Sequence, residues 1–162
     1  MNYSFNEARP ALEVFHTGDS VYAYNLLGAH LVNWNGRNGC VFRVWAPTAR
    51  SVSVAGEFNN WDNNATYMYD IGYGVWEVFV EGVEEFCAYK YCIESEYGDK
   101  LMKADPYAFH AQTRPGQASL VYDIENYSWN DGEWLEKRNE NNISSCPMNI
   151  YEIHAGSWRK YP

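Results

Sequence analysis

The sequence is short of positive charge. It contains 12 Lys and Arg residues against 21 Asp and Glu residues, which gives a formal net charge of −9. Proteins that bind nucleic-acid backbones or anionic membrane surfaces need Lys and Arg side chains to meet the phosphates. We therefore expect no nucleic-acid and no membrane partner, and a neutral or polar ligand fits this composition better.

Long apolar runs are also missing. No stretch is long enough to span a bilayer, and the opening MNYSFNEARP lacks the basic start and the apolar run of a signal peptide. These two absences predict a cytoplasmic protein.

Metal-binding and disulfide patterns are absent from the sequence. The cysteines are Cys40, Cys87, Cys92 and Cys146, and no two of them have CxxC spacing. The four histidines show neither HxxxH nor HExxH spacing. We expect no metal, no cofactor and no disulfide framework.

Catalytic patterns are equally scarce. No pair of carboxylates stands out among the acidic residues, since glycosidase chemistry depends on their separation in space. Glu152 and His154 alternate so that they would share one face of a strand, where they would form either an acid/base pair or an ordinary structural hydrogen bond.

Aromatic residues, in contrast, are abundant. The chain is 46% hydrophobic and 17% aromatic, with 14 Tyr and 7 Trp residues. Such a composition is too rich in core-forming residues for a disordered chain, and aromatic side chains favour strands. A chain of 162 residues suits one domain with some additional sequence.

Short apolar runs separated by turn residues follow Leu27, and several of them alternate with period two. In CVFRVWA, Phe42, Val44 and Ala46 would share one face of a strand while Arg43 would take the other. In AYKYCIE, Tyr89, Tyr91 and Ile93 share a face and Lys90 points away from it. Many short strands joined by Gly, Asn and Pro turns predict an all-β fold, an antiparallel β-sandwich over residues 39–123.

The two ends of the chain have different patterns. Residues 1–38 suggest short helical or irregular pieces, with a helical turn or two after Pro10, and a first strand. Residues 124–147 are polar and suggest a linker whose Trp129 and Trp134 pack back onto other residues. Residues 148–162 include MNIYEIHAGSW, which is apolar on both faces and typical of a strand in a buried parallel sheet. We expect them to be the start of a truncated second domain.

The stretch VAGEFNNWDNN places Trp61 within a run of Asn, Asp and Glu. Val54 and Phe58 already supply the core face, so Trp61 lies in a loop, where binding residues concentrate. One interpretation is that its indole covers a small cluster under the loop. The other is that it stacks on the C–H face of a glucose ring while neighbouring amides such as Asn60 bind the hydroxyls.

A series of motifs in the same order resembles the N-terminal part of bacterial 1,4-α-glucan (glycogen) branching enzymes. These motifs are FRVWAPTARSVSVAGEFNNWDNN, GVWEVFV, YKYCIES, KADPYAF, RPGQASLVYD, YSWNDGEW and MNIYEIHAGSWRKYP. The resemblance runs from about Tyr24 to Pro162. Within it, residues 39–123 resemble a family-48 carbohydrate-binding module, an immunoglobulin-like sandwich related to the glycogen-binding domain of AMP-activated kinase β subunits.

The resemblance implies that IYEIHAGSW is the first strand of a (β/α)₈ catalytic barrel, whose catalytic carboxylates lie outside these residues. The full-length protein would be a retaining glucanotransferase that passes an α-1,4-glucan segment to a 6-hydroxyl. The implied partners are glycogen, amylose or malto-oligosaccharide and the protein's own barrel domain. The present chain is expected to have no branching activity alone.

The binding residues of the kinase module carry over only in part. The resemblance implies that Trp61 is a stacking residue and that Lys90, in YKY, contacts sugar hydroxyls. The kinase module's second stacking Trp is missing, because Leu101 and Met102 occupy that stretch, and an Asn of that module falls near Ala118. Two functions stay open: a weak glucan-binding module, or a structural sandwich that packs on the barrel without binding glycan.

Overall fold

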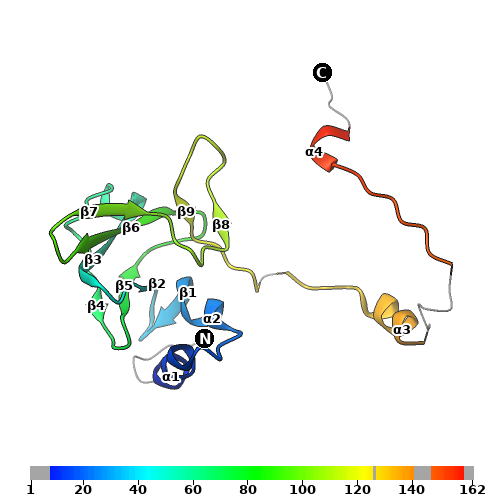
Figure 1. Ribbon diagram of the computed structural model, residues 1–162, viewed down its shortest axis with the longest axis horizontal. Coiled ribbons are helices and arrows are strands. Elements are labelled where there is room, and N and C mark those ends of the chain that lie inside the picture. The colour runs from blue at the N-terminus through cyan, green and yellow to red at the C-terminus, as the bar shows by residue number, and fades with distance from the viewer. Residues whose placement is uncertain (1–7, 126, 141–146, 159–162) are drawn as a thin grey trace. The chain divides into compact units, whose positions relative to one another are not determined.

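The computed structural model describes residues 8–125, 127–140 and 147–158 and divides the chain into two compact units, Met1–Asn126 and Tyr127–Pro162 (Figure 1). The first unit contains α1 (Arg9–Thr17), α2 (Ala23–Leu26), β1 (Gly28–Trp34), β2 (Arg37–Trp45), β3 (Ala49–Gly56), the 3₁₀-helix η1 (Glu57–Asn59), β4 (Tyr69–Asp70), β5 (Val75–Glu81), β6 (Ala88–Ser95), β7 (Lys100–Lys103), β8 (His110–Ala111) and β9 (Ser119–Leu120). The second contains α3 (Gly132–Glu140) and α4 (Ala155–Trp158). Among the described residues, none of the helices is both long and apolar enough to cross a bilayer.

The strands form two antiparallel sheets. Sheet A has the order β1-β2-β5-β4, and sheet B has the order β3-β6-β9-β8, with β7 also paired to β6. This arrangement confirms the predicted antiparallel β-sandwich. The strand β1 pairs with β2 along its whole length, so sheet A begins before the boundary expected at Gly39.

The core lies between the sheets and follows the alternation seen in the sequence. Phe42 and Val44 of β2 are buried against Val54 of β3 and against Tyr89 and Tyr91 of β6. The predicted inward faces of β2 and β6 are therefore correct. Because adjacent strand residues point to opposite faces, Lys90 lies on the outer face of sheet B.

A second, smaller apolar cluster joins the N-terminal helices to sheet A. The helix α1 has Pro10 in its first turn and ends at Gly18, whose left-handed φ of 84° lets its N–H reach the Phe15 carbonyl at 3.1 Å. Leu12 of α1 packs with Leu26 and with Val75 of β5. The helical turns expected after Pro10 are therefore present and cover one end of the sheet.

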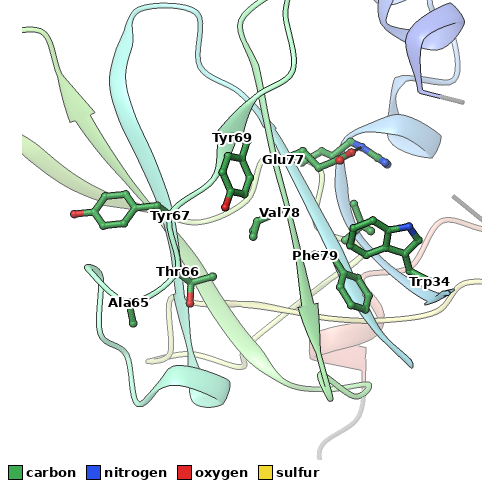
Figure 2. A pocket seen from close by; sticks show the side chains of 10 residues that line it. Trp34, Ala65, Thr66, Tyr67, Tyr69, Glu77, Val78 and Phe79 are labelled. Atoms are coloured by element: carbon green, nitrogen blue, oxygen red, sulfur yellow. Dashed lines mark hydrogen bonds and ion pairs between the residues drawn. The ribbon is translucent and has the colours of Figure 1, made fainter. Parts of the chain in front are cut away.

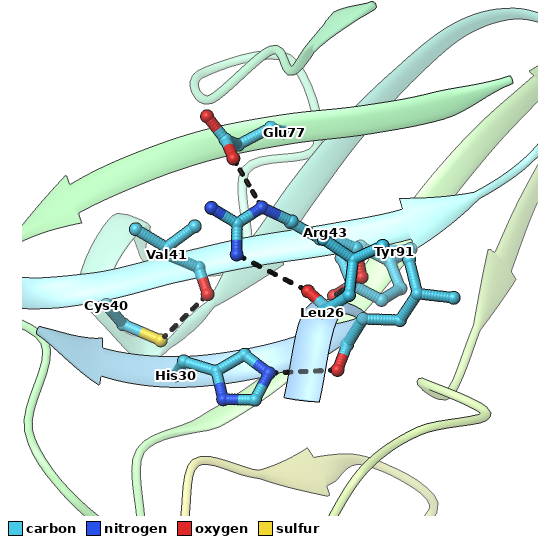
Figure 3. A network of polar contacts seen from close by, with 8 residues as sticks. Leu26, His30, Cys40, Val41, Arg43, Glu77 and Tyr91 are labelled. Carbon is cyan, nitrogen blue, oxygen red and sulfur yellow. Dashed lines mark hydrogen bonds and ion pairs between the residues drawn. The ribbon is translucent and has the colours of Figure 1, made fainter. Parts of the chain in front are cut away.

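Arg43 points away from the central core but is only 1% exposed. Its Nε donates to the Glu77 carboxylate on β5, and its Nη1 donates to the Leu26 carbonyl at 3.4 Å (Figure 3). The Arg43 carbonyl accepts from the Tyr91 hydroxyl at 3.2 Å. A buried charge needs such partners, because losing water is costly for the ionised group.

The hydroxyls of the two core tyrosines meet a buried carboxylate. Tyr89 and Tyr91 donate to Oδ2 of Asp105 at 2.6 and 3.2 Å, and the Tyr107 N–H donates to Oδ1 at 2.8 Å. Burial raises the pKa of Asp105, and these donors oppose the shift by stabilising the ionised form. The network lets two phenols reside in the core without an unpaired polar group.

The segment that was expected to begin a second domain lies in the C-terminal unit. The described residues 147–154 contain no strand, and the short helix α4 follows them. Ile150 and Tyr151 are 85% and 75% exposed. A strand needs a hydrogen-bonded neighbour, and the described part of the chain supplies none for this segment. The start of a barrel at residues 148–162, whose first strand would need parallel neighbours, stays a prediction.

Two further expectations fall in the second unit. Trp129 and Trp134, which we expected to pack back onto other residues, are 77% and 59% exposed. Trp134 lies on α3, where the Arg138 guanidinium carbon stands over its ring at 5.0 Å from the ring centroid. His154 Nδ1 lies 2.8 Å from the Ser157 hydroxyl, which favours the structural interpretation of that histidine. Cys146 lies outside the described residues.

The Arg43–Glu77 ion pair generates the first prediction. Glu77→Gln removes the carboxylate charge that meets the buried Arg43 guanidinium and should lower the free energy of unfolding by about 3–5 kcal/mol. Glu81→Gln is the control, because Glu81 meets Arg37 at 3.5 Å with both side chains more than half exposed, and its loss should cost less than about 1 kcal/mol. Urea unfolding of both variants makes the comparison, and equal losses would contradict the assigned role of the buried pair.

Candidate functional site

The Trp61 turn, residues 56–66, leaves the end of β3 in an unusual backbone conformation. After η1, Asn60 and Trp61 have φ values of 54° and 61°, both in the left-handed region. That region is rare for a bulky residue and persists only where surrounding contacts fix it. The Trp61 N–H donates to the Gly56 carbonyl at 2.9 Å, so the backbone itself sets the direction of the indole.

Asn59 is the centre of this turn. Its Oδ1 accepts from the Gly56 N–H at 2.9 Å. Its Nδ2 lies 3.0 Å from the Val54 carbonyl, 3.2 Å from the Asp62 carbonyl and 3.0 Å from the Thr66 hydroxyl. One amide therefore ties the start, the middle and the end of the turn together.

The turn is also fixed to the neighbouring strand β6. Glu57 accepts the Ala88 N–H at 3.0 Å through its carboxylate. A Cβ atom on Gly56 would lie 2.5 Å from the Ala88 carbonyl oxygen, a distance that real Cβ atoms do not tolerate. Glycine is required here by close packing of the two backbones.

The three predicted site residues lie at one end of sheet B. Trp61 is 41% exposed, and Asn60 beside it is also exposed. Lys90 is half-buried and pairs across from Ala55, next to the Gly56 and Tyr89 pair. The register thus places Lys90 one step along from the glycine that holds the Trp61 N–H.

Three residues that were not selected from the sequence extend the polar surface of the turn. Lys100 of β7 donates to the Asn64 side-chain oxygen at 2.9 Å, and the Tyr67 hydroxyl donates to the same oxygen at 3.4 Å. Asn64 is visible in the Asn-rich run, but its contact with β7 depends on the folding of a distant hairpin.

Leu101 and Met102 occupy the stretch in which the related kinase module has its second stacking tryptophan. Met102 of β7 lies opposite Cys92 and is 41% exposed, and Leu101 is 50% exposed. Ala118, near which an Asn of the related module falls, is buried. The exposed apolar side chains of this part of β7 are therefore a leucine and a methionine.

This arrangement suits a neutral, hydroxyl-rich ligand. An exposed indole face packs on C–H groups, while the Lys90 ammonium and nearby amides donate to hydroxyls. In the described part of the chain, no group of three or more His, Cys, Asp or Glu side chains is placed to hold a metal ion.

Comparison with known families agrees with this geometry. Residues 26–108 match the family described as carbohydrate-binding module 48 (isoamylase N-terminal domain). The chain belongs to this family. The matched residues include β1, the Trp61 turn and Lys90, so the module extends further toward the N-terminus than the sandwich expected from residue 39.

Individual relatives of this module extend the comparison. The chain is 46% identical over 147 residues to the 1,4-alpha-glucan branching enzyme GlgB of Bacillus mycoides, covering 90% of the chain and 23% of the relative. It therefore spans about a quarter of that relative's length, and the resemblance to branching enzymes is confirmed for the N-terminal region.

Solved structures of pullulanases share the fold. The pullulanase of Bacillus acidopullulyticus matches at 25% identity and a TM-score of 0.50, covering 61% of this chain and 12% of that one. The maltotriose complex of PulA from Klebsiella pneumoniae matches at 26% identity and a TM-score of 0.50, covering 65% and 12%.

The hydrogen bonds of Asn59 generate the second prediction. Asn59→Ala removes all of them and should lower the free energy of unfolding by about 1–3 kcal/mol, with loss of hydrogen-exchange protection at the Gly56 amide. Asn60→Gly is the matched control, since glycine adopts the same left-handed conformation and stability should change little. Thermal unfolding and amide exchange measure both effects. If the two variants unfold alike, Asn59 does not organise the turn.

Proposed function

We propose that this module binds α-glucan, such as glycogen or a malto-oligosaccharide, on the surface formed by Trp61, Asn60 and Lys90. The observation that carries the proposal is the left-handed Trp61, whose indole is held partly in solvent by the hydrogen bonds of the turn. Backbone strain of this kind is retained mainly where it serves a site.

The chemistry of glucose matches these side chains. Its ring presents axial C–H groups that pack on the Trp61 indole, and its equatorial hydroxyls accept from the Lys90 ammonium or exchange hydrogen bonds with Asn60. With one indole and one cation, the affinity for a single chain is low. Glycogen offsets low affinity by offering many chain ends at once.

The relatives support a wider proposal for the whole protein. As in a branching enzyme, the module would act beside its own catalytic barrel, which would transfer α-1,4-glucan segments to 6-hydroxyls. The barrel would supply the catalytic carboxylates, and residues 148–162 would be its start. The layout of extension, module and linker, and the cytoplasmic location, stay predictions.

A second function is favoured by one observation. Met102 occupies the place of a second stacking residue, and a single indole is a small platform. A sandwich that only packs on the barrel would need no glycan contact at Trp61. The two functions predict different effects of removing the Trp61 indole on glycogen binding and on the melting temperature.

Trp61→Ala provides the third prediction. Loss of the stacked ring and its buried area should weaken glycogen binding by about tenfold or more. The melting temperature should change little, since a part-exposed loop side chain leaves no closed cavity. Lys90→Met should weaken binding less, because it keeps the apolar stem and removes only the donors. The measurement is native gel electrophoresis with and without glycogen, alongside thermal unfolding.

Tyr97→Ala is the control for this experiment. Tyr97 is 93% exposed beyond the C-terminal end of β6, so its truncation removes an exposed aromatic ring that is not among the residues proposed to bind glucan. It should be retarded by glycogen as strongly as the wild type. Equal retardation of Trp61→Ala would rule out the glycan role, and a large fall in its melting temperature would favour the structural sandwich.

A further inference from the structure

A second aromatic surface lies on sheet A, around a groove of about 540 Å³ (Figure 2). Its lining includes Trp34 of β1, Phe79 of β5, Tyr69 of β4 and Tyr67 just before β4. The surface selected from the sequence, in contrast, lies on sheet B. Pockets of this volume are in the range that holds small ligands, about 300–1,000 Å³.

The groove exists because β4 is short. β4 pairs only with Trp76 and Glu77 of β5, so the following residues of β5 have no β4 partner on that side. Thr66 lines the groove there, and its hydroxyl lies 3.0 Å from Nδ2 of Asn59. The turn that carries Trp61 therefore also fixes one wall of the groove.

One side of the groove is a rigid aromatic pair. Trp34 and Phe79 meet edge to face with centroids 5.1 Å apart. The Arg37 guanidinium lies 5.7 Å from the Trp34 centroid and 5.8 Å from the Phe79 centroid, and it also meets Glu81 at 3.5 Å. These contacts hold both rings in place before any ligand arrives.

The other side carries two exposed phenols. Tyr69 is 69% exposed and Tyr67 is 49% exposed, and the Tyr67 hydroxyl also reaches Asn64. Exposed tyrosines combine a flat apolar face with a polar tip. The groove thus offers aromatic faces for stacking and hydroxyls at its rim.

The charges of the groove argue against an ionic ligand. Arg43 and Glu77 line it, are almost fully buried and form an ion pair with each other. Their opposite charges cancel, so the described lining residues together carry no net charge that would attract an anion or a cation. A neutral ligand with apolar faces and many hydroxyls can stack on the aromatic rings and form hydrogen bonds with the hydroxyls at the rim.

We propose that this groove is a second α-glucan site, which binds a segment of linear α-1,4-glucan against Tyr69 and the Trp34–Phe79 pair. The proposal rests on the glucan-binding function proposed above but uses different side chains on the other sheet. Two sites on one module raise the overall affinity for a branched polymer, since binding at one site concentrates further chains near the other.

The test is a titration of the full 162-residue chain with maltoheptaose, in which binding is measured by isothermal titration calorimetry and by changes in ¹H–¹⁵N chemical shifts. Trp61→Ala should keep a residual binding event, with shifts at Tyr69, Phe79 and the Trp34 indole. Adding Tyr69→Ala to Trp61→Ala should weaken that residual binding at least fivefold. Adding Tyr69→Phe instead should preserve most of it, because the ring remains.

The outcomes separate the two proposals. If Trp61→Ala abolishes all binding, or if Tyr69→Ala leaves the residual event unchanged, the groove is not a glucan site while the Trp61 site stands. If Tyr69→Ala abolishes binding and Trp61→Ala does not weaken it, the groove stands and the Trp61 site fails. A dimer that Tyr69→Ala dissociates, without maltoheptaose shifts in the groove, would overturn the proposal in favour of a second copy as the occupant.

Discussion

The buried residue Arg43 connects three parts of the module. Its backbone carbonyl accepts from Tyr91 in the central core, its side chain pairs with Glu77 on β5, and it donates to Leu26 at the end of α2. A charge in this position is tolerable only if all three parts are assembled around it. The two sheets, the N-terminal helices and the groove on sheet A are therefore coupled through one residue, by its carbonyl and its side chain together.

The Trp61 turn shows how backbone constraints hold an aromatic side chain partly in solvent. The Asn59 side-chain amide makes its hydrogen bonds within the turn, and Gly56 allows the turn to approach β6 closely. Trp61 has a left-handed backbone conformation between these contacts. Thr66, at the end of the same turn, lines the groove beside β5. The turn therefore orients the indole by hydrogen bonds and also fixes a wall of the second aromatic surface. Such preorganisation lowers the entropy lost when a flexible sugar chain binds.

The fold could be predicted largely from the sequence, because strand alternation is a local property. The period of two by itself places Phe42, Tyr89 and Tyr91 inward and Lys90 outward. The choice of Trp61 is local as well, since an indole within an Asn-rich turn is visible in the sequence. The proposed role of this turn came from the family resemblance and not from the local pattern.

Only the tertiary structure decided what surrounds these residues. Period two placed Arg43 outward, but the helices and Glu77 bury it, and no local pattern predicts a partner on a distant strand. The described residues near Ile150 form no strand, because a strand needs neighbours supplied by other parts of a fold. The groove at Tyr69 likewise depends on how far β4 pairs along β5, a long-range property that the sequence of either strand does not contain.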